Sequence, residues 1–168
     1  MALRPNQILA VGGLPYSLID GEPAKSVVDV VERQLWTPAG LRSLGPGEPG
    51  YIGRYGGDMR QRDGAYHQGT VWPWLIGAFV DAWLRVRGNS DDARREARAR
   101  FLVPLLRHYE SSAPGHVAEI ADGNAPHTAG GCPFQAWSVG EALRLSQDVL
   151  RVDVAGASPP GPAFARAG

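Results

Sequence analysis

One acidic residue stands in an apolar setting that suits general acid–base chemistry. Glu119 lies in the stretch GHVAEIADGNAP, between Ala118 and Ile120. A carboxylate held in such a loop can act as a general base once the protein sets its position and its ionisation. A solvated loop acid is the commoner role of a lone glutamate. The loop leads to CPFQAWS and the start of the last apolar helix, however, and this favours the catalytic interpretation.

A second group of chemistry-bearing residues stands in RDGAYHQGTVWPWLIGAF, at the start of an apolar run. Sugars are bound by aromatic faces against their C–H surfaces and by planar polar groups against their hydroxyls. Tyr66, Trp72 and Trp74 supply rings, whereas His67 and Gln68 supply donors and acceptors. Trp72 and Trp74 are two positions apart, so at most one of them is expected to face a ligand. In the alternative interpretation, His67 caps a helix and both tryptophans pack in the core.

Three further side chains could contact a sugar. Asp63 follows Arg62, and the two can bind a hydroxyl or bridge to each other or to the loop, which is the more common role. Gln135 opens the last apolar helix, and Trp137 follows it with the same two interpretations as the other tryptophans, ligand contact or packing.

The histidines and the cysteine do not form a metal-binding pattern. No two of them stand at ligand spacing on a helix, and no CxxC pair is present. We expect neither a metal nor a cofactor. Because Cys132 is the only cysteine, an internal disulfide is excluded and a reducing compartment is favoured.

Charge and hydropathy argue against several classes of partner. The 17 basic and 17 acidic residues balance, and no basic stripe is present, so we expect no nucleic acid and no anionic membrane as partner. The N-terminus does not read as a secretory signal, and no run of 18 apolar residues occurs. The chain is therefore expected to be soluble and cytoplasmic.

The elements that must position these residues are predicted to be helices. Apolar residues recur at helical spacing over residues 22–35, where Asp20 can cap the first turn. A helix over residues 66–87 has no charge between positions 71 and 80, so it is expected to be buried all round. The other expected elements are a weak helix at 6–19, a helical turn from Thr37 to Leu44, a helix at 91–109 kinked by Pro104, a last helix at 136–151, and long loops at 45–64 and 111–134.

A weak internal repeat indicates how these helices are arranged. Gln7, Gln68 and Gln135 each stand at the start of an apolar helix, at spacings of 61 and 67 residues. Such a repeat of helical hairpins resembles an (α/α) toroid, whose inner helices present their starts to a common funnel. We therefore expect an all-α fold over residues 1–151, the incomplete last part of a six-hairpin barrel. The tail over residues 152–168 is expected to be disordered.

Five long motifs resemble one known family. RPNQILAV, TPAGLRSLGPGEPGYIGRYGG, RDGAYHQGTVWPWLIGAF, AEIADG and GCPFQAWSVGEALR are similar to the C-terminal glucosidase part of glycogen debranching enzymes. The resemblance implies an (α/α)6 barrel that hydrolyses the α-1,6-linked glucose left at a branch point of a glycogen-like glucan, with inversion. It matches Glu119 to the general base, and it places His67, Gln68 and Trp72 in the sugar pocket.

The chain also departs from that family. The general acid of the family is an aspartate in an earlier W-x-RD-like segment, which has no counterpart here, and Asp63 belongs to the later motif. We therefore expect the chain to be the last part of a longer enzyme and inactive alone, requiring an upstream segment or self-association to cover its apolar helix faces.

Two other functions stay open at this point. The chain could be a non-catalytic glucan-binding or helical interaction module that keeps the pocket without the acid. It could also belong to a related (α/α)-barrel glycosidase that acts on trehalose, mannose or another α-linked sugar. In each case the expected partner is a glucan or an oligosaccharide.

Overall fold

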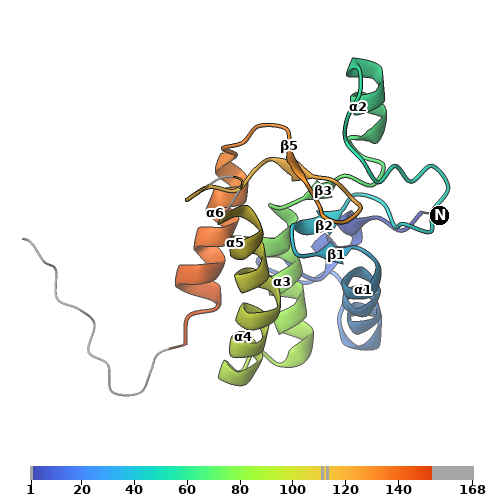
Figure 1. Ribbon diagram of the computed structural model, residues 1–168. Helices are drawn as coiled ribbons and strands as arrows, with labels where there is room; N and C mark the ends of the chain where they lie inside the picture. Colours follow the sequence, from blue (N-terminus) through green and yellow to red (C-terminus); the bar gives the residue numbers. More distant parts are fainter. Residues whose placement is uncertain (1, 111, 113, 153–168) are drawn as a thin grey trace, which may run out of the picture.

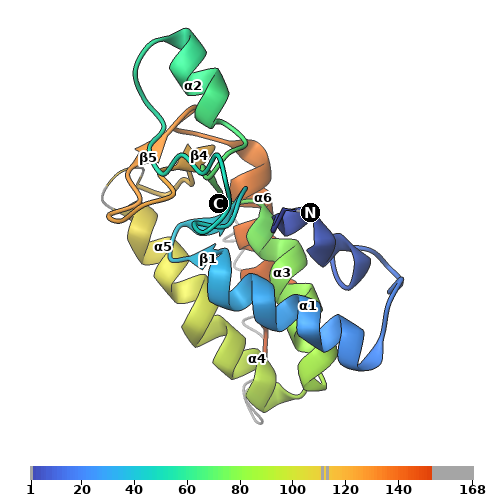
Figure 2. The ribbon, with the colours of Figure 1, turned by 90° about the vertical axis from the view of Figure 1, so that its right-hand side faces the viewer.

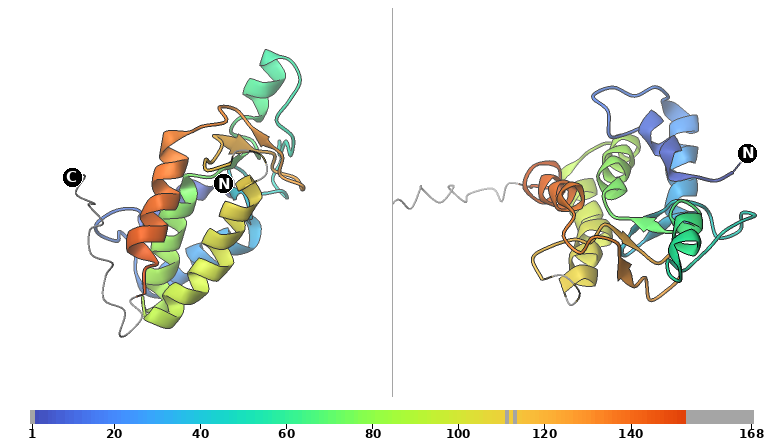
Figure 3. Two further views of the ribbon diagram at one scale, coloured as in Figure 1. Left: turned by 60° about the vertical axis from the view of Figure 1, so that its left-hand side comes forward. Right: turned by 90° about the horizontal axis from the view of Figure 1, so that it is seen from above.

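Helix α3 (Leu75–Arg87) lies at the centre of the fold, as its uncharged sequence predicts. The computed structural model describes residues 2–110, 112 and 114–152. Within them α3 packs most closely against η1 (Pro5–Ala10), α1 (Gly21–Gln34), α4 (Asp91–Ala97) and α6 (Ala136–Arg144), as Figures 2 and 3 show. It ends at Gly88, whose left-handed φ of 90° closes the helix.

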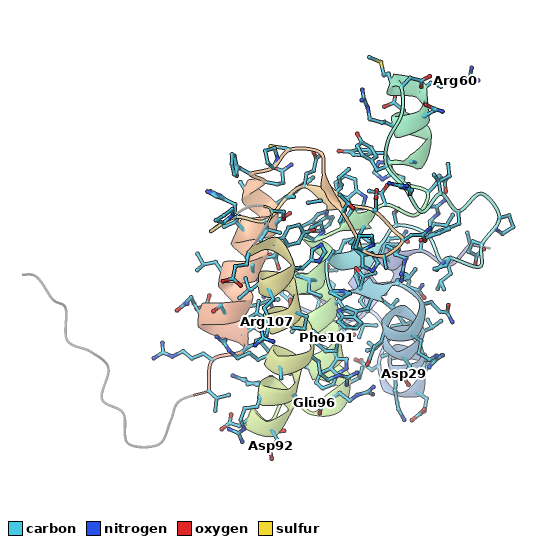
Figure 4. All side chains as sticks on the ribbon, in the orientation of Figure 1. Asp29, Arg60, Asp92, Glu96, Phe101 and Arg107 are labelled. Atoms are coloured by element: carbon cyan, nitrogen blue, oxygen red, sulfur yellow. The ribbon has the colours of Figure 1, made fainter. Side chains whose placement is uncertain are left out.

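An aromatic cluster joins α3 to the outer helix, the helical segment over residues 91–110. The ring of Phe101 meets those of Phe79 and Trp83 edge-on, at centroid distances of 5.0 and 5.5 Å. All three side chains are buried, and Phe101 is labelled in Figure 4. The indole of Trp83 also donates a hydrogen bond to Glu32 Oε2 on α1 (3.0 Å), so three helices meet at this point.

The outer helix confirms the prediction for residues 91–109. Ser90 caps α4 by accepting a hydrogen bond from the Ala93 amide. The chain then passes through a π turn, η2 (Arg98–Leu102), into α5 (Val103–Glu110). The irregularity expected at Pro104 therefore takes the form of a π turn just before it, because proline cannot donate to the regular α-helical pattern.

A small antiparallel sheet covers one end of the helices, so the expectation of an all-α fold is not confirmed (Figure 1). The structure remains helix-rich. Each strand pairs with the next in sequence, in the order β1 (Trp36–Thr37), β2 (Gly40–Arg42), β3 (Val71–Trp72), β4 (Ile120–Ala121) and β5 (Ala129–Gly130). Strands of two or three residues are too short to show an alternating pattern, which is why the sequence did not reveal them.

Two proline-containing segments were assigned to helix and instead enter this sheet. Thr37 and Gly40 form the ends of a tight turn between β1 and β2, with the Thr37 hydroxyl bonded to Gly40 O (3.0 Å). Proline fits the second position of such a turn as well as the start of a helix. The predicted helix 66–87 begins only at Leu75, because Pro73 disfavours helical geometry at Trp72.

Helix α2 (Met59–Ala65) projects from the body of the molecule, where a loop was expected over residues 45–64 (Figure 1). Asp58 and Gln61 form a reciprocal capping box at its start, which stabilises a helix of only seven residues. Figure 4 shows Arg60 at the end of α2 that lies farthest from the other helices. The segment after α2 leads directly into the aromatic residues of the candidate site.

The remaining predicted elements are confirmed in part. Helix α1 matches residues 22–35, although Asp20 at its cap position makes no side-chain cap hydrogen bond. The weak helix at 6–19 is reduced to η1, and the loop at 111–134 contains β4 and β5. Helix α6 continues into a π turn, η3 (Leu145–Val149). Of the predicted tail, residues 153–168 lie outside the described part of the chain. No helix in the described part is long and apolar enough to cross a membrane.

Candidate active site

The Glu119 carboxylate is held by two hydrogen-bond donors from different parts of the chain. Glu119 stands immediately before β4, and Gly131 lies opposite it after β5. The Tyr66 hydroxyl donates to Oε1, and the Cys132 backbone amide donates to Oε2 (2.8 Å). Two donors on two oxygens fix the plane of the carboxylate. Glu119 is therefore a half-buried, oriented acid, unlike a freely solvated loop glutamate.

Tyr66 joins this carboxylate to the aromatic cluster. It terminates α2, and its ring lies 4.8 Å from Trp72, 4.9 Å from His67 and 5.8 Å from Tyr55, between ring centroids. Burial, together with the hydrogen bond to Glu119 and the negative charge of that carboxylate, raises the pKa of Tyr66 to about 12. Tyr66 therefore stays a hydrogen-bond donor throughout the neutral range.

The two tryptophans proposed to bind sugar occupy different environments. Trp72 is only 6% exposed, its ring stacks on His67 at an interplanar angle of 7°, and its Nε1–H donates to Tyr66 O (3.1 Å). Trp137 is 49% exposed and stacks against Trp74 at 5.6 Å. Trp72 therefore supports Tyr66 from within the fold, whereas Trp137 is the ring available to a ligand.

The polar candidates are only partly brought together. His67 is exposed beside Trp72, but Gln68 Oε1 accepts a hydrogen bond from Arg4 (2.9 Å), which also donates to His67 O (2.7 Å). Part of the hydrogen-bonding capacity of Gln68 is thus used in attaching the N-terminal segment. Gln135 stands at the cap position of α6, without a side-chain cap hydrogen bond, two residues before Trp137.

Asp63 does not join the cluster. It is exposed on α2, and it makes no hydrogen bond or ion pair with any residue that the structure describes. Its neighbour Arg62 donates to Gly57 O (3.3 Å), so the suggested bridge to the loop is made by the arginine alone.

Sequence reasoning missed the Cys132 amide and gave no role to Tyr55 and Arg4. The Cys132 amide is a backbone group, so no side-chain motif could reveal it. Tyr55 and Arg4 stand in the motifs YIGRYGG and RPNQILA, which carried the family resemblance but no assigned role. Among the described residues, no group of three or more His, Cys, Asp and Glu side chains could hold a metal ion.

An oriented carboxylate among aromatic rings suits a glycosidase-like protein, and the comparison with known families gives the same class. Residues 1–144 match the family described as amylo-alpha-1,6-glucosidase, and the chain belongs to this family. It is 27% identical, over 166 residues, to the glycogen debranching enzyme of Saccharomyces cerevisiae. That match covers 88% of this chain and 11% of the yeast protein, so the chain spans about a tenth of its relative. The resemblance inferred from the motifs is thereby confirmed.

Proposed function

We propose that the chain supplies the general base of a glycoside hydrolase that removes α-1,6-linked glucose from branch points of glycogen-like glucans. The observation that supports this most directly is the Glu119 carboxylate, held by the Tyr66 hydroxyl and the Cys132 amide beside the aromatic cluster. A general base must be placed within hydrogen-bond reach of the proton that it removes, and two donors limit the directions in which this carboxylate can accept.

The proposed reaction is an inverting displacement. Glu119 takes a proton from a water molecule as that water attacks the anomeric carbon, and an acid on the other side of the sugar protonates the departing oxygen. Inverting enzymes keep these two carboxyl groups about 6.5–9.5 Å apart, which leaves room for the water. We assign the acid to a segment outside this chain and not to Asp63, which projects into solvent on α2.

The proposed sugar pocket is formed by the start of α6 and the segment that follows α2. Trp137 presents the open ring face. Trp72 contacts both Trp137 and His67, and His67 presents a polar edge to the pocket. We also assign Tyr66, Gln68 and Gln135 to this pocket, where they hold its other side chains in place or contact sugar hydroxyls. Trp72 acts from behind, because its indole N–H is bonded to the backbone of Tyr66.

We further propose that these helices belong to an (α/α)6 toroid that this chain does not complete alone. A cavity of about 470 Å³ with a largely apolar lining lies between α5 and α6, and two of the residues that line it, Leu106 and Leu143, are 43% and 58% exposed. Apolar surface of this kind is typically covered by another element. An upstream segment of a longer protein or a second copy of the chain would cover it, and the isolated chain is expected to be inactive.

A glucan-binding module without catalysis is the second candidate. The exposed ring of Trp137 favours it, because an aromatic platform can hold a sugar whether or not an acid is present.

Hydrolysis of a branched oligosaccharide with a single α-1,6-linked glucosyl unit separates the two functions. The assay compares the chain alone with a form that also carries the residues encoded upstream, each with Glu119 and with Glu119→Gln. We expect only the extended form to release glucose, and the substitution to reduce the rate by about 10²–10⁴-fold. An extended form that binds malto-oligosaccharide but releases no glucose would support the binding module instead.

A further inference from the structure

A second cavity, of about 410 Å³, lies beside the candidate active site at the foot of α2. Its wall combines charged, aromatic and glycine residues from two segments of the chain, and the ones that matter here are Arg54, Tyr55, Asp122, Thr128 and Gly130. This volume is within the range of small-molecule pockets and near its lower end. None of the residues singled out as site candidates from the sequence lies in its wall.

The cavity is preformed, because its two segments are tied together on both sides of Arg54. The Asn124 amide donates to Gly53 O (2.9 Å), and the Tyr55 amide donates to Asp122 Oδ1 (2.7 Å). The backbone of Asp122 is itself fixed in the β4–β5 hairpin, where its amide donates to Thr128 O (2.9 Å). These bonds set the position from which each polar side chain reaches the cavity.

Two polar side chains in the wall have hydrogen-bonding capacity that a ligand could use. Asp122 Oδ2 accepts no hydrogen bond from the described residues, and the nearest cation, Arg54 Nε, is 3.9 Å away. The Arg54 side chain is 86% exposed, so its ion pair with Asp122 contributes little to stability. A carboxylate that accepts and a guanidinium that donates therefore face the same small space.

The charges of these two groups restrict the kind of ligand. An anion would be attracted by Arg54 and repelled by Asp122, and a cation would meet the opposite pair of forces. A neutral molecule with several hydroxyl groups satisfies both, since hydroxyls donate to carboxylates and accept from guanidinium groups. The glycine-lined part of the wall leaves room for a bulky ring next to Tyr55.

The wall of the cavity ends next to the position of Glu119 along the β5 segment. A Cβ atom on Gly130 would lie 3.6 Å from the Tyr55 ring, whereas one on Gly131 would lie 2.5 Å from Glu119 Oε2. One step in sequence, roughly 3.8 Å between Cα atoms, thus separates the residue that contacts the cavity from the one that contacts the carboxylate. Two neighbouring units of one oligosaccharide could occupy the two places together.

We propose that the Arg54–Tyr55–Asp122 cavity is a second glucosyl-binding subsite, which holds a sugar unit adjacent to the one at Glu119. The proposal rests on the proposed function for its ligand class, an α-glucan. It adds a binding site for the chain that carries the branch, and it assigns the recognition of that chain to the Arg54 guanidinium and the Asp122 carboxylate.

Calorimetric titration of the whole chain with glucose and with maltotriose tests this subsite. The wild-type chain should bind maltotriose more tightly than glucose. Arg54→Gln and Asp122→Asn should each weaken maltotriose binding about tenfold while leaving glucose binding nearly unchanged. Asp122→Asn keeps an oxygen for the Tyr55 amide, so the hairpin should stay folded. Arg60→Gln, an exposed arginine on α2, is the matched control and should bind as wild type.

The outcomes separate this inference from the proposed function. Equal affinity of the wild-type chain for the two sugars, or wild-type maltotriose binding by both variants, would overturn the subsite. Neither result bears on glucose release by the extended form, which depends on Glu119. If the extended form released no glucose while the chain still bound maltotriose more tightly than glucose, the catalytic proposal would be rejected and the subsite would stand.

Discussion

The Tyr66 hydroxyl donates a hydrogen bond to Glu119 Oε1 across 53 positions of sequence. Tyr66 ends the projecting helix α2, whereas Glu119 precedes β4, so the contact joins two segments that are distant in the chain. The ring is held in turn by its neighbours Tyr55, His67 and Trp72. The orientation of the carboxylate therefore depends on the packing of an aromatic cluster.

This contact predicts the titration of Tyr66. Glu119→Gln removes a negative charge and should lower the pKa of Tyr66 from about 12 toward the ordinary value of about 10. Because the pKa is raised in the folded chain, the associated stabilisation is complete below about pH 10 and is lost as the pH rises toward 12. Titration of ring-labelled tyrosine followed by NMR measures the pKa directly. Glu141→Gln, which removes a carboxylate bonded to Arg144, is the control. An unchanged Tyr66 pKa in Glu119→Gln would contradict the contact.

Tyr66 is also predicted to be a positioning residue in the proposed reaction. Tyr66→Phe keeps the ring but removes the donor to Oε1, so the carboxylate can turn away from its productive orientation. In the extended form we expect kcat to fall on the order of ten- to a hundredfold with little change in KM. Tyr51→Phe, which removes only a bond to Asn124 Oδ1, should have no such effect. A higher KM with kcat unchanged would show that Tyr66 contributes to binding instead.

Trp137 is predicted to contact the sugar face. Trp137→Ala removes the exposed ring of α6, and we expect maltose affinity to fall about fivefold, as measured by calorimetry. Trp137→Phe should recover part of the loss because it restores an aromatic face. Leu143→Ala shortens another exposed side chain of the same helix and is the control. Equal losses in both alanine variants would indicate an effect on α6 in general.

The approach of the N-terminal segment to α3 predicts a difference between two glycines. A Cβ atom on Gly12 would lie 2.3 Å from the Ala82 nitrogen and 2.5 Å from the Ala78 oxygen, and these backbone atoms cannot move aside. Gly12→Ala should lower the free energy of unfolding by roughly 1–3 kcal/mol or more.

Gly140, within α6, has open space at the same position and serves as the comparison. Gly140→Ala should raise the free energy of unfolding by about 0.5–1 kcal/mol, because alanine is the better helix former. Urea denaturation followed by circular dichroism measures both changes. A Gly12→Ala chain as stable as wild type would mean that the N-terminal segment does not pack this closely on α3.

The sequence supported the buried helix α3 and the outer helix α4–α5 well, because long periodic segments carry many residues that agree with each other. Short strands and turns contain only two or three residues, and tertiary contacts can override the local conformational preference of so few residues. Thr37-Pro38 fits a helix start locally, yet Thr37 pairs with Gly40 in a hairpin whose second strand, β2, pairs in turn with β3. The projecting helix α2 was missed because glycines on both sides masked its capping box.

By itself, the sequence determined the family, the helical body and the identity of Glu119 as the candidate base, because each depends on residue type and order. Only the tertiary structure decided that Tyr66 and the Cys132 amide hold that carboxylate, that Trp72 is buried and Trp137 open, and that Asp63 stands apart. It also placed Arg54 beside Asp122, 68 positions away. Such contacts join segments that meet only when the β4–β5 hairpin packs at the foot of α2. No local sequence pattern encodes a contact between residues so far apart in the chain.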